Sequence, residues 1–205
     1  TFNTQLDIDS QIINIASKVD HSIHNLYMRV SGNQFDMTHY LAADSNSNEQ
    51  NGALFAPLAL PFALWLGRSQ MEVSLGKLKL PDFDADNIYV NLFGNQKVLR
   101  LSSFNSDIFG GQVNATGRLD IRPKTPTFNL QVSLSNIDLE VALPAMADSS
   151  DITGLLSLES TIQSAGNSSD EIIQELRGGG EITVVNPAYT AINVEETFCN
   201  AATLF

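Results

Sequence analysis

Residues Val98 to Leu139, VLRLSSFNSDIFGGQVNATGRLDIRPKTPTFNLQVSLSNIDL, decide the fold of this chain. Near the end of this stretch, Phe128, Leu130, Val132 and Leu134 alternate with polar residues. A period of two places all four apolar side chains on one face of a β-strand. Such a face must be covered by something.

A second strand is predicted just before the first, over residues 112–121, where Val113, Leu119 and Ile121 keep the same spacing. The connection between the two strands contains two prolines, which cannot donate to a sheet ladder. The Gly110-Gly111 pair allows positive φ at the preceding turn. The stretch therefore predicts an antiparallel meander, and its candidate groove or core face is Phe128, Leu130, Val132, Leu134, Val113, Leu119 and Ile121.

The rest of the chain predicts more strands and few helices. Strand patterns cover residues 4–15, 26–30, 71–80 with a bulge at Gly76, 88–92 and 152–162, and turns are expected at 31–33 and 94–95. Irregular or helical structure is expected at 138–146. A Ser168-x-x-Glu171 capping box predicts a helix to residue 177, ended by the glycines at 178–180, and a last helix begins at Asn193. The fold class is α+β, mostly β.

A polar, aperiodic stretch at residues 44–53 is predicted to be a linker. Residues 1–43 are then the end of a preceding β module, and residues 54–205 form a β-rich C-terminal module with a short helix at 62–66. Because the chain lacks an initiator Met and stops inside a helical pattern, we expect it to be a fragment truncated in that helix.

Charge and hydropathy exclude several classes of function. The net charge is −12 with only 11 Lys and Arg, which argues against binding to nucleic acid and against direct adsorption to anionic lipid headgroups. The longest apolar run, residues 53–66, is too short for a membrane span and is interrupted by Pro57 and Pro61. No signal peptide is recognised. The single cysteine, Cys199, is interpreted as a buried thiol.

The sequence offers no arrangement suited to catalysis or metal binding. Asp82, Asp84 and Asp86 have calcium-loop spacing, but Asn87 and Phe93 stand where such a loop needs Gly and Glu. The histidines lack further ligands at suitable spacing, and no nucleophile motif is present. We therefore predict no enzyme activity, no catalytic or metal residues and no cofactor.

Several ordered segments resemble the C-terminal region of the bacterial AsmA family. They are FDMTHYL (35–41), PFALWL (61–66) followed by EVSLGKLKL (72–80), DIFGGQV (107–113), SNIDL (135–139), and LRGGGEI (176–182) followed by AINV (191–194). The set spans about four fifths of the chain, and its order and spacing carry the resemblance. The acidic 81–87 loop departs from the family pattern.

The resemblance implies a periplasmic module of a Gram-negative protein that is anchored in the inner membrane by a helix outside this fragment. Relatives of the TamB type look like bridge-shaped lipid carriers. On this analogy, the sheet is long and curved with an apolar concave face, its ligand is phospholipid, and outer-membrane assembly factors are possible partners. No nucleic-acid partner is implied.

Two questions remain open from the sequence. The apolar face could be covered by lipid, by the 168–177 and 193–205 helices, or by a neighbouring module. The exposed Asn, Ser and Asp positions also fit a second class of function, a periplasmic or extracellular β-rich adhesion or glycan-binding module.

Overall fold

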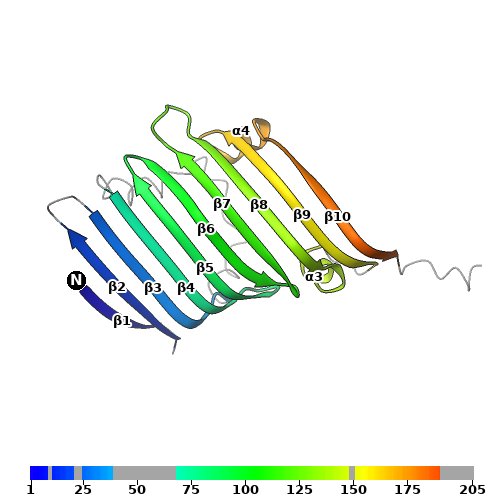
Figure 1. Ribbon diagram of the computed structural model, residues 1–205, viewed down its shortest axis with the longest axis horizontal. Coiled ribbons are helices and arrows are strands. Elements are labelled where there is room, and N and C mark those ends of the chain that lie inside the picture. Colours follow the sequence, from blue (N-terminus) through cyan, green and yellow to red (C-terminus); the bar gives the residue numbers. More distant parts are fainter. Residues whose placement is uncertain (9–10, 21–24, 39–67, 148–150, 190–205) are drawn as a thin grey trace, which may run out of the picture.

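A computed structural model describes residues 1–8, 11–20, 25–38, 68–147 and 151–189. Ten strands of these ranges form one sheet (Figure 1). They are β1 (Phe2–Ile8), β2 (Gln11–Asp20), β3 (Asn25–Asp36), β4 (Arg68–Lys79), β5 (Asp84–Asn95), β6 (Val98–Ile108), β7 (Gly111–Asp120), β8 (Thr127–Asp138), β9 (Ile152–Ala165) and β10 (Arg177–Tyr189). The predicted linker at 44–53, the helices at 62–66 and from Asn193, and Cys199 lie outside the described residues.

The strands lie in the sheet in chain order, so the predicted meander is confirmed. Every neighbouring pair is antiparallel except β3 and β4, which are parallel with Val30 opposite Val73. A parallel pair needs a long crossover, and residues 37–67 supply one. The division into two modules stays a prediction. The described strands on its two sides, β3 and β4, are joined by one ladder.

The register gathers apolar residues of all ten strands on one face. Directly opposite residues share a face of a sheet, so chains of paired residues trace rows across it. One row crosses every strand and contains Thr4, Ile15, Val30, Val73, Val90, Phe104, Ala115, Val132, Ser160 and Gly180. A second complete row contains Phe2, Ser17, Met28, Met71, Leu92, Leu101, Gly117, Leu130, Ile162 and Gly178. We call the face that carries these rows the apolar face and the other the polar face.

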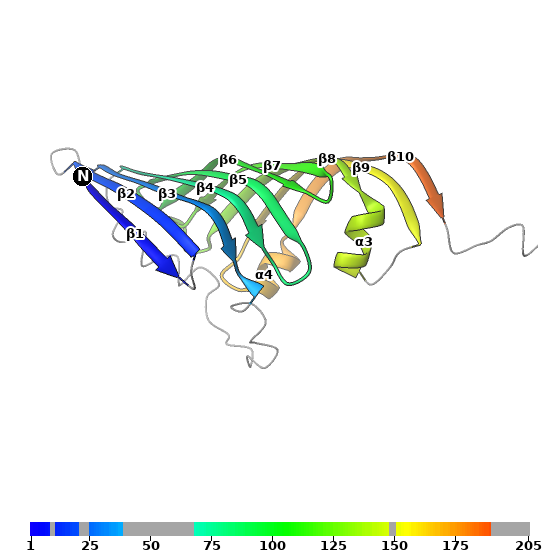
Figure 2. The same cartoon turned by 90° about the horizontal axis from the view of Figure 1, so that it is seen from below.

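Irregular positions bend the strands near one end. Asn87, Asn136 and Asn186 have φ of 52°, 55° and 51°, and the pairing register shifts next to each of them. Asparagine tolerates the left-handed conformation better than most residues, and bulges increase local twist and bend. Figure 2 shows the strands curving toward the side that carries both described helices, so the apolar face is concave as expected.

The two described helices lie on the apolar face at opposite ends of the strands. Helix α3 (Leu139–Ala147) follows β8 and buries Ala142 against Phe109 and Ile137. Helix α4 (Ser169–Gln174) follows β9, and Ser164 Oγ donates a hydrogen bond to the carbonyl oxygen of Ile172. The N-cap of the predicted capping box is present, with Glu171 N–H donating to Ser168 Oγ at 3.3 Å, while the Glu171 carboxylate accepts from the N–H of Asn167 at 2.7 Å.

Two turn predictions and one prediction of a helix end were wrong because glycine was interpreted as a turn or capping residue; α4 ends at Gln174 and β10 already begins at Arg177. Residues 31–33 lie inside β3, where a Cβ at Gly32 would be 2.8 Å from Ile13 Cδ1. Residues 178–180 lie inside β10, where a Cβ at Gly180 would be 2.3 Å from the carbonyl oxygen of Glu159. These glycines allow close approach in the sheet. Strand β5 continues through 94–95, and the chain reverses at Gln96 and Lys97.

The strand predicted at residues 4–15 is two strands. Ile8 pairs with Gln11, so β1 and β2 form a hairpin. The reversal changes the phase of the alternation, because Leu6 shares its face with Ile13 whereas Ile12 pairs with Asp7 on the polar face. The alternation of apolar and polar residues continues through the β1–β2 hairpin, so it did not indicate where the chain reverses.

Candidate functional site

The candidate site is the apolar face, and the structure brings most of its predicted residues into direct pairs. Val113 lies opposite Leu134, and Leu119 lies opposite Phe128. Leu130 and Val132 lie between these pairs on β8, opposite Gly117 and Ala115. Ile121 directly follows β7, where its N–H donates to the carbonyl oxygen of Lys97. All seven predicted residues are half-buried.

Among the described residues, only α3 and α4 pack on the apolar face, and they leave most of its width uncovered. No side chain among the described residues is completely buried. Toward the two edges of the sheet, Phe2 is 64% exposed and Ile182 is 68% exposed. Ordinary soluble domains bury such a surface against a second layer. Here the described helices cover only two small areas near the strand ends.

The best-covered area lies under α3. Ile137 is 4% exposed there and contacts Phe109 and Ala142. The rings of Phe83 and Phe109 have their centroids 5.0 Å apart. This cluster fixes α3 at one end of the strands, and α4 contacts Ser164 at the other end. The row through Val132 passes between the two helices.

The apolar face carries no charged residue in the two rows that cross all ten strands. Nine strand spacings of ~4.8 Å make the face about 43 Å across. Contiguous apolar patches on a soluble domain mark binding sites, so this uncharged face is the candidate binding surface of the described part of the chain. The chemistry available is sequestration of apolar material from water.

Charged groups of the strands point to the polar face, where some of them form ion pairs. Glu72 accepts hydrogen bonds from Tyr27 at 2.7 Å and from Arg29 at 2.8 Å. The Tyr27 hydroxyl, followed by the Arg29 guanidinium, lowers the pKa of the Glu72 carboxyl. Lys77 forms ion pairs with Asp84 at 3.2 Å and Asp86 at 2.9 Å. This separation leaves the two complete rows of the apolar face without a charged residue.

Other kinds of site are not found in the described part of the chain. Within residues 1–8, 11–20, 25–38, 68–147 and 151–189, no three His, Cys, Asp or Glu side chains gather as a metal site would require. The calcium-like aspartates belong to the β4–β5 connection and β5, where two of them hold Lys77. No helix in these ranges is long and apolar enough to cross a membrane.

A comparison with known protein families identifies the family of the chain. The family model described as AsmA family matches residues 10–204. The chain belongs to the AsmA family. The resemblance noted in the sequence is thereby confirmed. No curated protein and no solved structure matches the chain. Proteins of the AsmA family are associated with the cell envelope, and membership implies a role in outer-membrane and lipid-related biogenesis.

The sequence predicted the part of the apolar face that lies on β7 and β8. It did not predict that more distant strands contribute to the same face. Ile15, Val30 and Val90 lie in the same row as Val132. Each belongs to an alternating segment, which was the available signal. Only the register shows that the separate apolar faces are one surface.

Proposed function

We propose that this AsmA-family module shields phospholipid acyl chains on its apolar face, as a non-enzymatic periplasmic part of a protein anchored in the inner membrane. The observation that carries the proposal is a concave apolar face, uncharged along complete rows of ten strands, that the two described helices leave largely open. Acyl chains need only apolar contact, and a surface without charges lets them change position at little cost.

The apolar rows continue from one edge of the sheet to the other, which supports movement of lipid along the face as well as shielding of lipid. The rows run perpendicular to the strands from β1 to β10, and apolar side chains continue to both edges at Phe2 and Ile182. Neither helix interrupts the row through Val132. An acyl chain lying across the strands therefore meets a similar surface at every step. Outer-membrane assembly factors remain possible partners under this proposal.

The test is extraction and mass spectrometry of lipid from the protein purified from Gram-negative cells. We expect co-purified phospholipid with the unmodified chain. Val132→Asp places a carboxylate in the middle of the apolar face and should sharply reduce the bound lipid. Gln131→Asp is the matched control on the polar face and should leave the lipid unchanged.

Stability measurements on the same variants separate an open face from a covered one. On an open face, water reaches the new charge, and Val132→Asp should cost about 1 kcal/mol or less. A buried, unpaired carboxylate would cost several times more. Absence of phospholipid together with strong signals on a glycan array would instead support the adhesion or glycan-binding function.

A further inference from the structure

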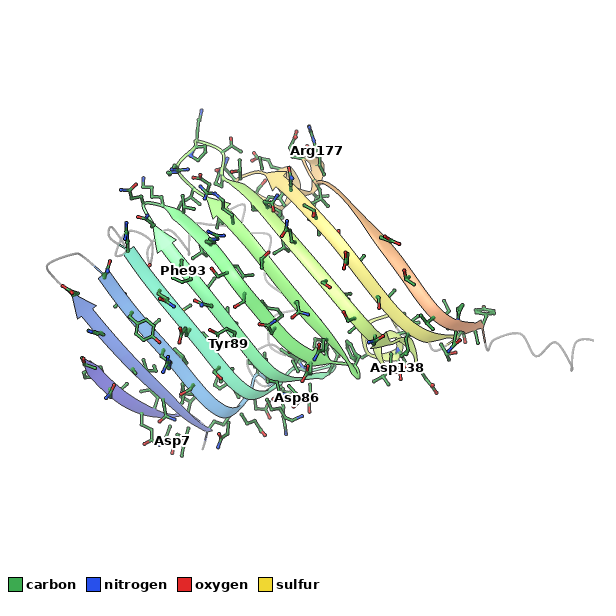
Figure 3. The ribbon with its side chains drawn as sticks, viewed as in Figure 1. Asp7, Asp86, Tyr89, Phe93, Asp138 and Arg177 are labelled. Carbon is green, nitrogen blue, oxygen red and sulfur yellow. The ribbon has the colours of Figure 1, made fainter. Side chains whose placement is uncertain are left out.

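Lysine and arginine are concentrated at one end of the strands. This is the end where β2, β5 and β7 stop and where β3, β4, β6, β8 and β10 start. Eight of the 11 basic residues lie at or near it: Lys18, Arg68, Lys97, Arg100, Arg118, Arg122, Lys124 and Arg177. The opposite end is acidic. Figure 3 shows Asp7, Asp86 and Asp138 along that end and Arg177 at the basic end. The total charge of −12 hides this separation.

Part of the basic end forms an ordered row on the polar face. Following the register from β2 to β10, the row contains Lys18, Tyr27, Gln70, Phe93, Arg100, Arg118, Asn129, Gln163 and Arg177. We call it the cationic row. It holds four cations, two aromatic rings and three amides, and no carboxylate. Eight strand spacings make it roughly 38 Å long.

The cations of this row are incompletely neutralised. Arg100 lies directly opposite Arg118, and like charges in that position repel. Asp120 is 3.3 Å from Arg118, but it is held more closely by Arg122, whose Nε donates to it at 2.8 Å. The hydrogen bond from Arg122 is the main cause that lowers the pKa of Asp120. Arg177 forms an exposed ion pair with Glu175 at 3.4 Å. Within the described residues, no salt bridge joins Arg100 or Lys18 to an acid.

The surface along the row is hollowed at several points. One depression of about 540 Å³ is lined by Lys18, Tyr27, Arg68, Gln70 and Phe93, with one carboxylate, Asp20, also in the lining. A second, of about 570 Å³, includes Arg100, Arg118 and Asn129. A third, of about 430 Å³, includes Gln163 and Arg177 together with Asp120 and Glu175, the carboxylates that pair with Arg122 and Arg177. Together they follow the cationic row over most of its length.

We propose that the cationic row binds an extended anionic glycan. Arginine side chains recognise carboxylate, sulfate or phosphate groups through directed hydrogen bonds. Exposed aromatic rings such as Phe93, which is 38% exposed, offer flat apolar surfaces to sugar rings, and amides bond to hydroxyl groups. A single glycan chain is narrow enough to meet the local positive charge without approaching the acidic end.

The same observations disfavour an anionic bilayer as the occupant. The exposed aliphatic residues of the polar face, Ile12, Leu155 and Val185, lie toward the other end of the strands. A flat bilayer would also meet the net negative charge of the whole module, since Coulomb repulsion extends over about 10 Å at ordinary salt. This inference concerns the polar face and does not depend on lipid binding to the apolar face.

The test measures binding of polygalacturonate and dextran sulfate to the purified chain, with neutral dextran and phosphatidylglycerol vesicles as comparison ligands. We expect binding to the anionic glycans that weakens with added salt. Arg100→Gln with Arg118→Gln should lower the affinity at least roughly tenfold. The matched control, Arg29→Gln with Lys77→Gln, removes two charges from the same face outside the row and should leave the affinity within about twofold.

Phe93→Ala distinguishes a glycan site from a general polyanion site. It should weaken glycan binding without changing charge, and circular dichroism should show that each variant stays folded. Equal affinity of the unmodified chain and the Arg100/Arg118 variant overturns the proposal, as does absence of glycan binding. Vesicle binding that depends on the row, or insensitivity of glycan binding to Phe93→Ala, overturns it in favour of a membrane or a nonspecific polyanion surface.

Discussion

Two isoleucines on the apolar face should respond very differently to truncation. Ile137 is 4% exposed beneath α3, and Ile182 is 68% exposed on β10. Replacing either with Ala removes three carbon groups. At about 0.8 kcal/mol for each buried group, Ile137→Ala loses about 2.4 kcal/mol of transfer free energy. A residual cavity against Phe109 and Ala142 raises the expected loss of unfolding free energy to about 3 kcal/mol.

Ile182→Ala is the matched control. Only about a third of this side chain is removed from water, so the same calculation gives a loss below about 1 kcal/mol. Urea unfolding followed by circular dichroism measures both losses, and an unchanged m-value shows that the unfolded surface is the same. The expected difference between the variants is about 2 kcal/mol.

The results would refute the reasoning in two ways. A loss above 2 kcal/mol at both positions would mean that a further layer covers the apolar face as far as β10. A loss below 1 kcal/mol at both would mean that α3 does not pack on Ile137. Removal of bound lipid before unfolding is necessary, because a ligand of the native state adds its own stabilisation.

Three smaller changes test other parts of the fold. Asn136 has φ of 55°, so Asn136→Val should destabilise the protein by about 2 kcal/mol and Asn136→Gly by at most about 0.5, measured by urea unfolding. Because Arg122 lowers the pKa of Asp120 below its ordinary 3.8, the stability that this carboxylate contributes is present above that pH and is lost as the pH falls. The advantage of the unmodified chain over Asp120→Asn should therefore shrink below about pH 4, and a constant difference would contradict this. Ser168→Ala removes the N-cap of α4 and should speed hydrogen exchange in that helix without changing exchange in β8.

The sequence determined the class of the fold and the two-sided character of its strands. Alternation over 128–134 placed those residues on one face, and the prolines of the 122–126 connection separated β7 from β8. The turn at residues 109–110 was also predictable, with Gly110 at φ 73°. These features depend on residues close together in the chain, so local pattern is sufficient to find them.

Only the tertiary structure decided how the faces combine. The parallel pairing of β3 with β4, the hairpin of β1 and β2, and the internal glycines of β3 and β10 depend on contacts between segments far apart or on a tight reversal that periodicity does not mark. Whether helices cover an apolar face cannot be read from the face itself, because burial depends on where the other elements pack.

The distribution of charge shows the same limit. Total charge is a sum over the chain, whereas a ligand responds to the local distribution of charge on the surface that it contacts. Arg100 and Arg118 are 18 positions apart in sequence, and Lys18 and Arg177 are far more distant, yet the sheet register aligns all four in one row. The sequence by itself determined which residues are charged and which are apolar. The register decided which of them act together, because hydrogen bonding between strands sets the neighbours of every side chain.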